Sequence, residues 1–102
     1  MRRVMVSYRV KAASAAENEA YVKAVYEELH ATQPGGLRYA TFKLEDGVSF
    51  VHLAETEDDR NPLAAVKAFQ EFQAGIGERC EEQPHVRQLT EVGSFRLFGE
   101  SS

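Results

Sequence analysis

The stretch that decides the fold is residues 37–55, LRYATFKLEDGVSFVHLAE. Apolar side chains recur at every second position on both sides of Asp46-Gly47, and that period is typical of β-strands. Asp-Gly is a common turn of tight β-hairpins, because both residues tolerate positive φ. The stretch therefore predicts two antiparallel strands, over residues 37–44 and 48–55.

A strand and a helix are expected upstream of this hairpin. Apolar residues alternate across residues 4–11, beginning with Val4 and Val6. Residues 15–32 then repeat apolar side chains at helical spacing, as in Tyr21, Val25 and Leu29. Pro34-Gly35-Gly36 ends this helix, since proline cannot continue it and glycine adopts the left-handed turn.

Downstream, the chain repeats the same order of helix and strand. Asn61-Pro62 combines an N-cap residue with proline at the first helical position, which predicts a helix to about residues 75–80. Residues 81–84 are expected to connect it to a last strand over residues 86–98. The order β-α-β-β-α-β in a single domain, residues 1–102, predicts a ferredoxin-like α+β fold. In this fold two helices cover one face of a four-stranded antiparallel sheet.

Composition narrows the functional classes. The net charge is −4 and no stripe of Lys and Arg is present, so we expect neither nucleic-acid binding nor a membrane-surface role. The single cysteine, Cys80, excludes an internal disulfide, and its acidic neighbours do not favour a thiolate. The first apolar run is too short for a signal peptide or a membrane span. A cytoplasmic location is expected.

One face of the predicted sheet is apolar although no helix is left to cover it. We expect a homodimer in which two such sheets pack face to face. Arg9 and Glu55 lie on this face. With the first and third strands taken as parallel neighbours, they either pair there or remain solvated at its rim. The expected dimer interface consists of Met5, Arg9, Phe42, Leu44, Val51, Leu53 and Glu55.

Four segments resemble the antibiotic-biosynthesis monooxygenase-like proteins, a family of small βαββαβ chains. They are residues 8–11, 34–39, 50–55 and 92–96. The resemblance implies that two sheets pair into a dimeric α/β barrel, with a ligand pocket between the helices and the sheet. The family includes cofactor-independent oxygenases of phenolic or quinol substrates, haem-degrading enzymes and members of unknown role.

The residues that the haem-degrading branch uses are missing from this sequence. That branch has an Asn and a Trp at the positions of Val6 and Thr56, and a His on the second helix. The chain has no Trp, and no His lies between Asn61 and Cys80. Its three histidines show no metal-ligand spacing. We therefore expect no cofactor: neither metal, flavin nor haem.

His52 is the candidate catalytic residue. It alternates with Phe50 and Ala54, so it should face the helices, where a neutral imidazole with a pKa near 6.5 would act as a base toward a phenol or quinol hydroxyl. The alternative is a structural histidine whose nitrogens are hydrogen-bonded. The expected ligand pocket consists of Tyr8, Tyr39, Phe50, Phe69 and Phe72.

Two functions remain open from the sequence. The first is a cofactor-independent monooxygenase-like enzyme that acts on a small aromatic or quinol-type substrate. The alternative is a non-catalytic small-ligand-binding or structural homodimer of the same fold. A pocket that holds His52 within hydrogen-bond reach of a polar partner favours the enzyme. A helix–sheet layer filled by Tyr8, Phe69 and Phe72 favours the alternative.

Overall fold

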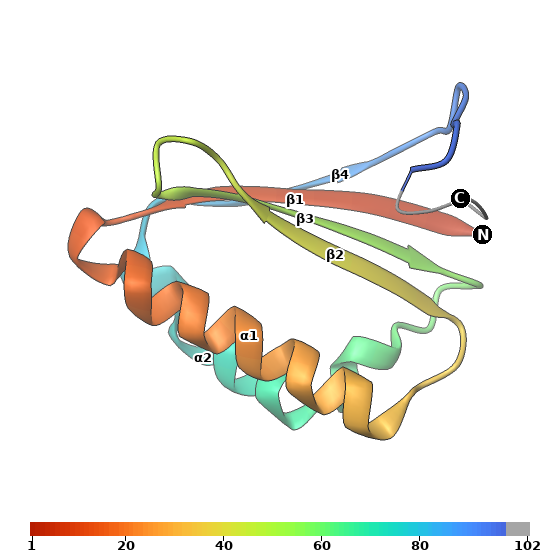
Figure 1. Ribbon diagram of the computed structural model, residues 1–102, viewed down its shortest axis with the longest axis horizontal. Helices are drawn as coiled ribbons and strands as arrows, with labels where there is room; N and C mark the ends of the chain where they lie inside the picture. The colour runs from red at the N-terminus through yellow and green to blue at the C-terminus, as the bar shows by residue number, and fades with distance from the viewer. Residues whose placement is uncertain (98–102) are drawn as a thin grey trace.

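A layer of two α-helices lies against one face of a four-stranded sheet in the computed structural model, which describes residues 1–97 (Figure 1). The sheet order is β2-β3-β1-β4, and each neighbouring pair is antiparallel. The predicted ferredoxin-like βαββαβ fold is confirmed. The elements are β1 (Arg2–Val10), the 3₁₀ helix η1 (Ala12–Ser14), α1 (Ala15–Thr32), β2 (Leu37–Lys43), β3 (Ser49–Thr56), the 3₁₀ helix η2 (Pro62–Ala65), α2 (Lys67–Arg79) and β4 (Cys80–Gln88).

The β2–β3 hairpin turns at Asp46-Gly47 and has the predicted faces, but of these two residues only Gly47 has a positive φ. Gly47 has a φ of +76°, and the Asp46 carboxylate accepts hydrogen bonds from the backbone N–H groups of Val48 and Ser49. In β3, Phe50 and His52 are buried beneath the helices, whereas Val51 and Leu53, which alternate with them, lie on the other face. The alternation in the sequence thus identified the helix-facing side of this strand correctly.

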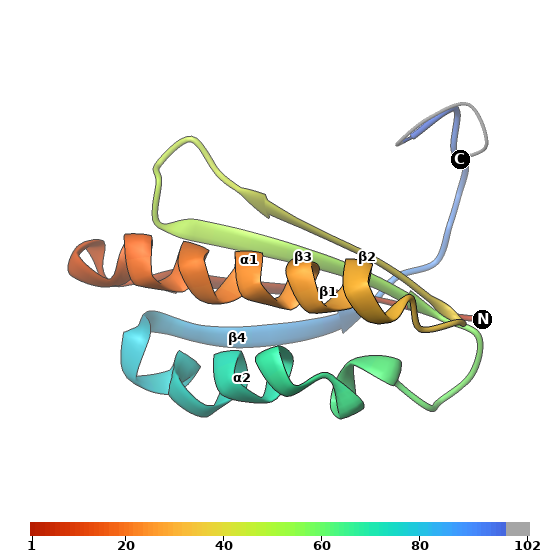
Figure 2. The same cartoon turned by 60° about the horizontal axis from the view of Figure 1, so that its bottom comes forward.

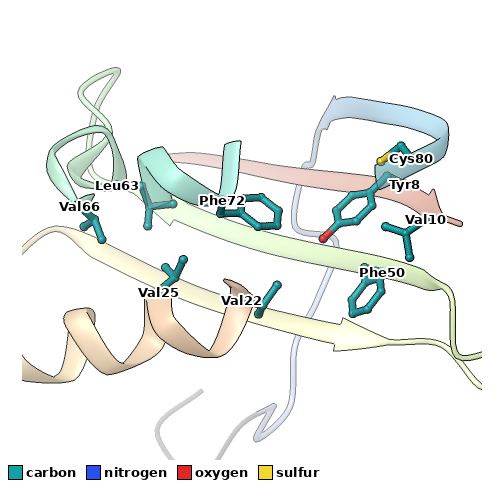
Figure 3. Packing of buried hydrophobic residues seen from close by; sticks show 9 residues of the cluster. All are labelled: Tyr8, Val10, Val22, Val25, Phe50, Leu63, Val66, Phe72 and Cys80. Atoms are coloured by element: carbon teal, nitrogen blue, oxygen red, sulfur yellow. The ribbon is translucent and has the colours of Figure 1, made fainter. Parts of the chain in front are cut away.

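The core fills the space between the helices and the sheet (Figure 3). Val22 and Val25 of α1 and Phe72 of α2 pack toward Tyr8 and Phe50 of the strands. This layer determines where every side chain of the candidate site lies, because both helices approach the same face (Figure 2).

The last strand starts earlier than the sequence suggested. β4 begins at Cys80, directly after α2, and pairs with β1 as far as Gln88, so residues 81–84 are strand rather than a connection. The strand is polar and contains Pro84, which an edge strand tolerates. Residues 89–97 form neither helix nor strand, and the expected end of the strand at Phe98 lies outside the described residues.

The second helix is divided at its start. Asn61 caps only η2, through a hydrogen bond of 3.0 Å from the Leu63 N–H to its Oδ1. The α-helix then begins at Lys67, where the Glu28 carboxylate of α1 accepts from the N–H groups of Lys67 and Ala68. A carboxylate at this end satisfies free N–H groups and interacts favourably with the helix dipole.

The predicted contact between Arg9 and Glu55 is wrong. β1 and β3 are antiparallel, because the crossover through α1 makes β1 parallel to β2 and the hairpin reverses β3. Arg3 therefore lies opposite Glu55 and forms an ion pair with it. Arg9 lies opposite Ser49 and approaches Glu81 and Glu82 of β4, at 3.8 and 3.3 Å.

The other sheet face is uncovered in the single chain. Met5, Val51 and Leu53 are half-buried there, and Phe42 and Leu44 are exposed. The segment after β4 rises on this side of the sheet, opposite the helices (Figure 1). Within residues 1–97, no helix has the length and apolar character needed to cross a membrane.

Candidate functional site

A cavity of about 290 Å³ lies between α2 and the sheet. Its walls are mostly apolar, and Tyr8, Tyr39, His52, Phe69 and Phe72 are among the residues that line it. Four of the five residues expected in the ligand pocket, together with His52, therefore surround one space. The exception is Phe50, which is 2% exposed and stacks on the Tyr8 ring from within the core, with centroids 5.6 Å apart.

His52 lies in the cavity wall with both ring nitrogens hydrogen-bonded. Its Nε2 is 2.8 Å from the Tyr8 hydroxyl, and its Nδ1 is 2.6 Å from the Tyr39 hydroxyl. The Thr41 hydroxyl is also 3.0 Å from Nδ1. The imidazole is thus held between two tyrosines, each of which lines the cavity.

Behind Tyr8 the hydrogen bonds continue to a buried positive charge. Asn18 of α1 donates from Nδ2 to the Tyr8 hydroxyl at 2.9 Å and accepts from Nε of Arg79 at 3.1 Å. Arg79 is 5% exposed and also donates to the carbonyl oxygen of Phe72. Its guanidinium lies 4.5 Å from the centroid of the Tyr21 ring and belongs to none of the ion pairs within residues 1–97.

On the opposite side of His52, the network ends in α1. Tyr26 is 2.7 Å from the Thr41 hydroxyl and stacks on the Tyr39 ring, with centroids 5.3 Å apart. These contacts fix the rotamer of Tyr39 and the position of Thr41. Hydrogen bonds therefore run without interruption from Arg79 through His52 to Tyr26.

Burial makes the network electrically neutral apart from Arg79. It lowers the pKa of the His52 imidazole from the ordinary 6.5 to about 4, because the charged ring loses its hydration. It raises the pKa of Tyr8 and of Tyr39 well above the ordinary value for a phenol, and that of Tyr26 to about 12. The expectation of a His52 pKa near 6.5 is therefore wrong. At neutral pH the ring is uncharged and the three phenols are protonated.

This arrangement changes the chemistry expected of His52. Both nitrogens already have partners within the protein, so the imidazole has no free nitrogen to present to the cavity. The hydroxyl groups of Tyr8 and Tyr39 link it to the space that both residues line. Hydroxyl groups and aromatic rings are the chemistry that the network supplies there.

Other reactive groups contribute little to this cavity. Burial raises the pKa of the Cys80 thiol, so the thiolate is disfavoured, as the sequence indicated. Among residues 1–97, no three His, Cys, Asp or Glu side chains are grouped so as to hold a metal ion. The polar part of the cavity lining outside the network consists of Arg2, Thr56, Asp59, Asn61 and Gln73.

Sequence reasoning missed four members of the network: Asn18, Tyr26, Thr41 and Arg79. Asn18 is four and seven residues before Val22 and Val25, so it lies on the buried stripe of α1. A polar residue on such a stripe is a signal that the sequence did contain. No comparable signal marked Arg79, because a basic residue in the last turn of a helix is ordinarily solvated.

Comparison with known proteins supports the fold assignment. No family model and no curated protein matches the sequence, but solved structures match over nearly the whole chain. An antibiotic biosynthesis monooxygenase superimposes with a TM-score of 0.73 at 20% identity, covering 91% of this chain and 100% of that one. A proposed member from Nitrosomonas europaea gives a TM-score of 0.75 at 12% identity, with 91% and 100% covered. The chain shares the fold of the antibiotic biosynthesis monooxygenases.

A third structure with this fold has a higher sequence identity to this chain than the first two structures, but a lower TM-score. A proposed antibiotic biosynthesis monooxygenase from Caulobacter crescentus is 24% identical, with a TM-score of 0.68 and 90% of both chains covered. The resemblance drawn from the sequence is thus confirmed at the level of the monooxygenase fold.

The buried imidazole predicts a dependence of stability on acid. The folded ring has a pKa of about 4, below the value of 6.5 in an unfolded chain, so the unfolded state binds more protons between these values. Stability should fall as pH falls from about 6.5 to 4, by about 3 kcal/mol from His52 alone. His52→Gln removes this titrating group. Denaturant titrations across this pH range should show a smaller loss for the variant, and an equal loss would contradict the prediction.

We predict that the buried position of the Arg79 guanidinium requires a glycine at position 75. A Cβ at Gly75 would lie 2.7 Å from Nη1 of Arg79, whereas one at Gly77 would lie at an ordinary 3.6 Å from Oε1 of Gln83. Alanine within a helix usually stabilises by up to about 1 kcal/mol relative to glycine. Gly77→Ala should therefore raise the melting temperature, and Gly75→Ala should lower it by displacing the bonded guanidinium. Equal stabilisation by both substitutions would show that Arg79 is free to move.

Proposed function

We propose that this protein is a cofactor-independent monooxygenase-like enzyme that acts on a small aromatic or quinol-type substrate. The observation that carries the proposal is the cavity between α2 and the sheet, whose aromatic walls include the hydrogen-bonded trio Tyr8, His52 and Tyr39. The shared monooxygenase fold supports the same reading. Flat apolar walls with a few polar groups suit one aromatic ring system that bears an oxygen.

The proposed reaction converts a ring C–H group of a phenol or quinol to C–O. One oxygen atom of O₂ enters the ring, and the other leaves as water with two hydrogens from the substrate. The substrate supplies all the electrons as its electron-rich phenolate, whose hydroxyl proton passes to bulk water and is returned to the departing oxygen atom. Hydrogen bonds from the site to the phenolate oxygen, in a cavity with mostly apolar walls, stabilise the negative charge that develops there.

One observation favours the alternative, a non-catalytic small-ligand-binding homodimer. Both nitrogens of His52 are occupied by side chains of the same chain, and the ring is uncharged at neutral pH. A histidine satisfied in this way can simply maintain the shape of a pocket. The two functions differ in whether a bound aromatic molecule is oxygenated.

Oxygen uptake with naphthohydroquinone as the probe tests the enzyme. We expect consumption above the rate of autoxidation, with one atom of isotopically labelled O₂ in the product. His52→Gln and Tyr39→Phe should lower this rate by about 100-fold, a magnitude typical of losing one hydrogen-bond donor to a developing negative charge. Tyr21→Phe, which keeps its ring beneath Arg79, serves as the control with unchanged activity. Saturable binding of the probe without turnover would contradict the enzymatic function and support the non-catalytic ligand-binding function.

We also propose that two copies pack through the uncovered face of the sheet. This face is apolar in the middle, at Met5 and Leu53, and ionic at both ends, where Arg3 and Arg9 meet carboxylates. Beyond β4, residues 89–97 rise on the same side and carry exposed apolar side chains such as Val92 and Phe95. A second copy of the chain would cover both the apolar residues of the sheet face and those of residues 89–97. A cytoplasmic homodimer without nucleic-acid or membrane partners completes the proposal.

The dimer makes a prediction about mass in solution. Sedimentation should give about twice the chain mass of 11.4 kDa. Leu53→Asp should shift the protein to the monomer, because a charge buried in the interface would lack a partner. Lys67→Asp, which introduces the same residue on the exposed side of α2, should remain dimeric. A monomeric wild type at micromolar concentration would contradict the interface.

A further inference from the structure

We propose that Arg79 and Asn18 fix which nitrogen of His52 carries the proton, so that the Tyr39 hydroxyl is a hydrogen-bond donor to the cavity. The site then takes a ligand that presents an acceptor oxygen, a carbonyl or a phenolate, at this position. The ligand class rests on the proposed function, whereas the proton position rests only on the hydrogen bonds of the network.

The first step concerns the orientation of Asn18. A guanidinium has donors only, so the side-chain atom of Asn18 that faces Nε of Arg79 is the acceptor Oδ1. The amide nitrogen Nδ2 is then turned toward Tyr8, where it donates to the hydroxyl oxygen. Arg79 cannot rotate away, because it is also bonded to the Phe72 carbonyl and lies against the Tyr21 ring.

The second step concerns the hydrogen of Tyr8. Within residues 1–97, the Tyr8 hydroxyl has two hydrogen-bond partners, Asn18 Nδ2 and His52 Nε2. Asn18 is a donor, so the hydroxyl hydrogen has its acceptor at Nε2. Tyr8 is 4% exposed, and a buried hydroxyl whose hydrogen lacks an acceptor is costly. Nε2 therefore carries no proton.

The third step follows from the charge on the ring. A neutral imidazole has one N–H group, and with Nε2 as an acceptor this group is at Nδ1. It points at the Tyr39 hydroxyl, 2.6 Å away, with the Thr41 hydroxyl as a second acceptor at 3.0 Å. The oxygen of Tyr39 accepts this hydrogen bond, so its own hydrogen goes to another acceptor, either the neighbouring Thr41 hydroxyl, with which Tyr39 is also hydrogen-bonded, or a ligand.

The last step is the consequence for a ligand. Tyr39 lines the cavity, so its hydroxyl hydrogen turns from Thr41 to an acceptor oxygen that fills that space. A ligand with an acceptor oxygen completes the chain that starts at Arg79, with every donor matched to an acceptor. A ligand that presents only a donor leaves two donors facing each other, which disfavours its binding. Arg79 and Asn18 touch no ligand and act as positioning residues.

Substitution of Asn18 by aspartate reverses the direction of hydrogen bonding at the Tyr8 hydroxyl. In Asn18→Asp, both carboxylate oxygens are acceptors, one for Arg79 and one for the Tyr8 hydroxyl. The Tyr8 oxygen then accepts from His52, which requires the proton to move from Nδ1 to Nε2. ¹⁵N NMR of the ring nitrogens at neutral pH reports this directly. We expect Nδ1–H in the wild type and in Tyr21→Phe, and Nε2–H in Asn18→Asp.

The wild-type spectrum keeps the test decisive even if the variant does not fold. A proton on Nε2 in the wild type would overturn the proposal, and so would a folded Asn18→Asp protein that retains Nδ1–H. Neither result depends on oxygenation, so failure of this inference is distinguishable from failure of the proposed function. A structural role alone predicts no movement of the proton between the nitrogens.

Two matched probes then test the donor in the cavity. Acetylnaphthalene presents a carbonyl, and ethylnaphthalene has nearly the same shape without an acceptor. Titration should show that the wild type prefers the ketone by about tenfold, as one hydrogen bond implies. The preference should disappear in Tyr39→Phe and shrink in Asn18→Asp. Equal affinity of the wild type for both probes would show that the cavity offers no donor.

Discussion

The side-chain amide of Asn18 is the interaction on which the rest of the site depends. It is fully buried, with 0% exposure, and it joins three elements: α1 carries it, β1 supplies Tyr8 and α2 supplies Arg79. A buried amide without partners costs several kcal/mol, so the helices and the strand are held in the one relative position that satisfies it. That position leaves the cavity open beside α2 and sets His52 at its wall.

Between the helices and the sheet, the polar side-chain atoms of the network bond mainly to one another, and aromatic rings form much of the cavity wall. Burial suppresses charge on His52 and on the tyrosines alike, so a positive field originates only from Arg79 in this network. The guanidinium lies behind Tyr8 and Phe72 instead of at the cavity surface. Its influence therefore reaches a ligand as an orientation of hydrogen bonds rather than as a direct ion pair.

Much of this architecture could be predicted from the sequence because local patterns determine it. Alternation placed His52 and Tyr39 on the helix-facing side, and Asp46-Gly47 located the hairpin turn. β4 could not be read in this way: its residues are polar, since an edge strand has little to bury, and the apolar residues after it are not strand. The network also depends on pairs far apart in the chain, such as Asn18 with Arg79, which no local period encodes.

The contact between Gly75 and the end of Arg79 turns a packing detail into a marker that can be read in other sequences. The glycine lies one helical turn before the arginine, and the guanidinium occupies the space that any larger side chain would need. Chains of this fold with glycine and arginine four residues apart at the end of α2 should hold a buried guanidinium against the aromatic ring that corresponds to Tyr21. Where the arginine is replaced by a small residue, the glycine is released from its constraint, and the two positions should vary together.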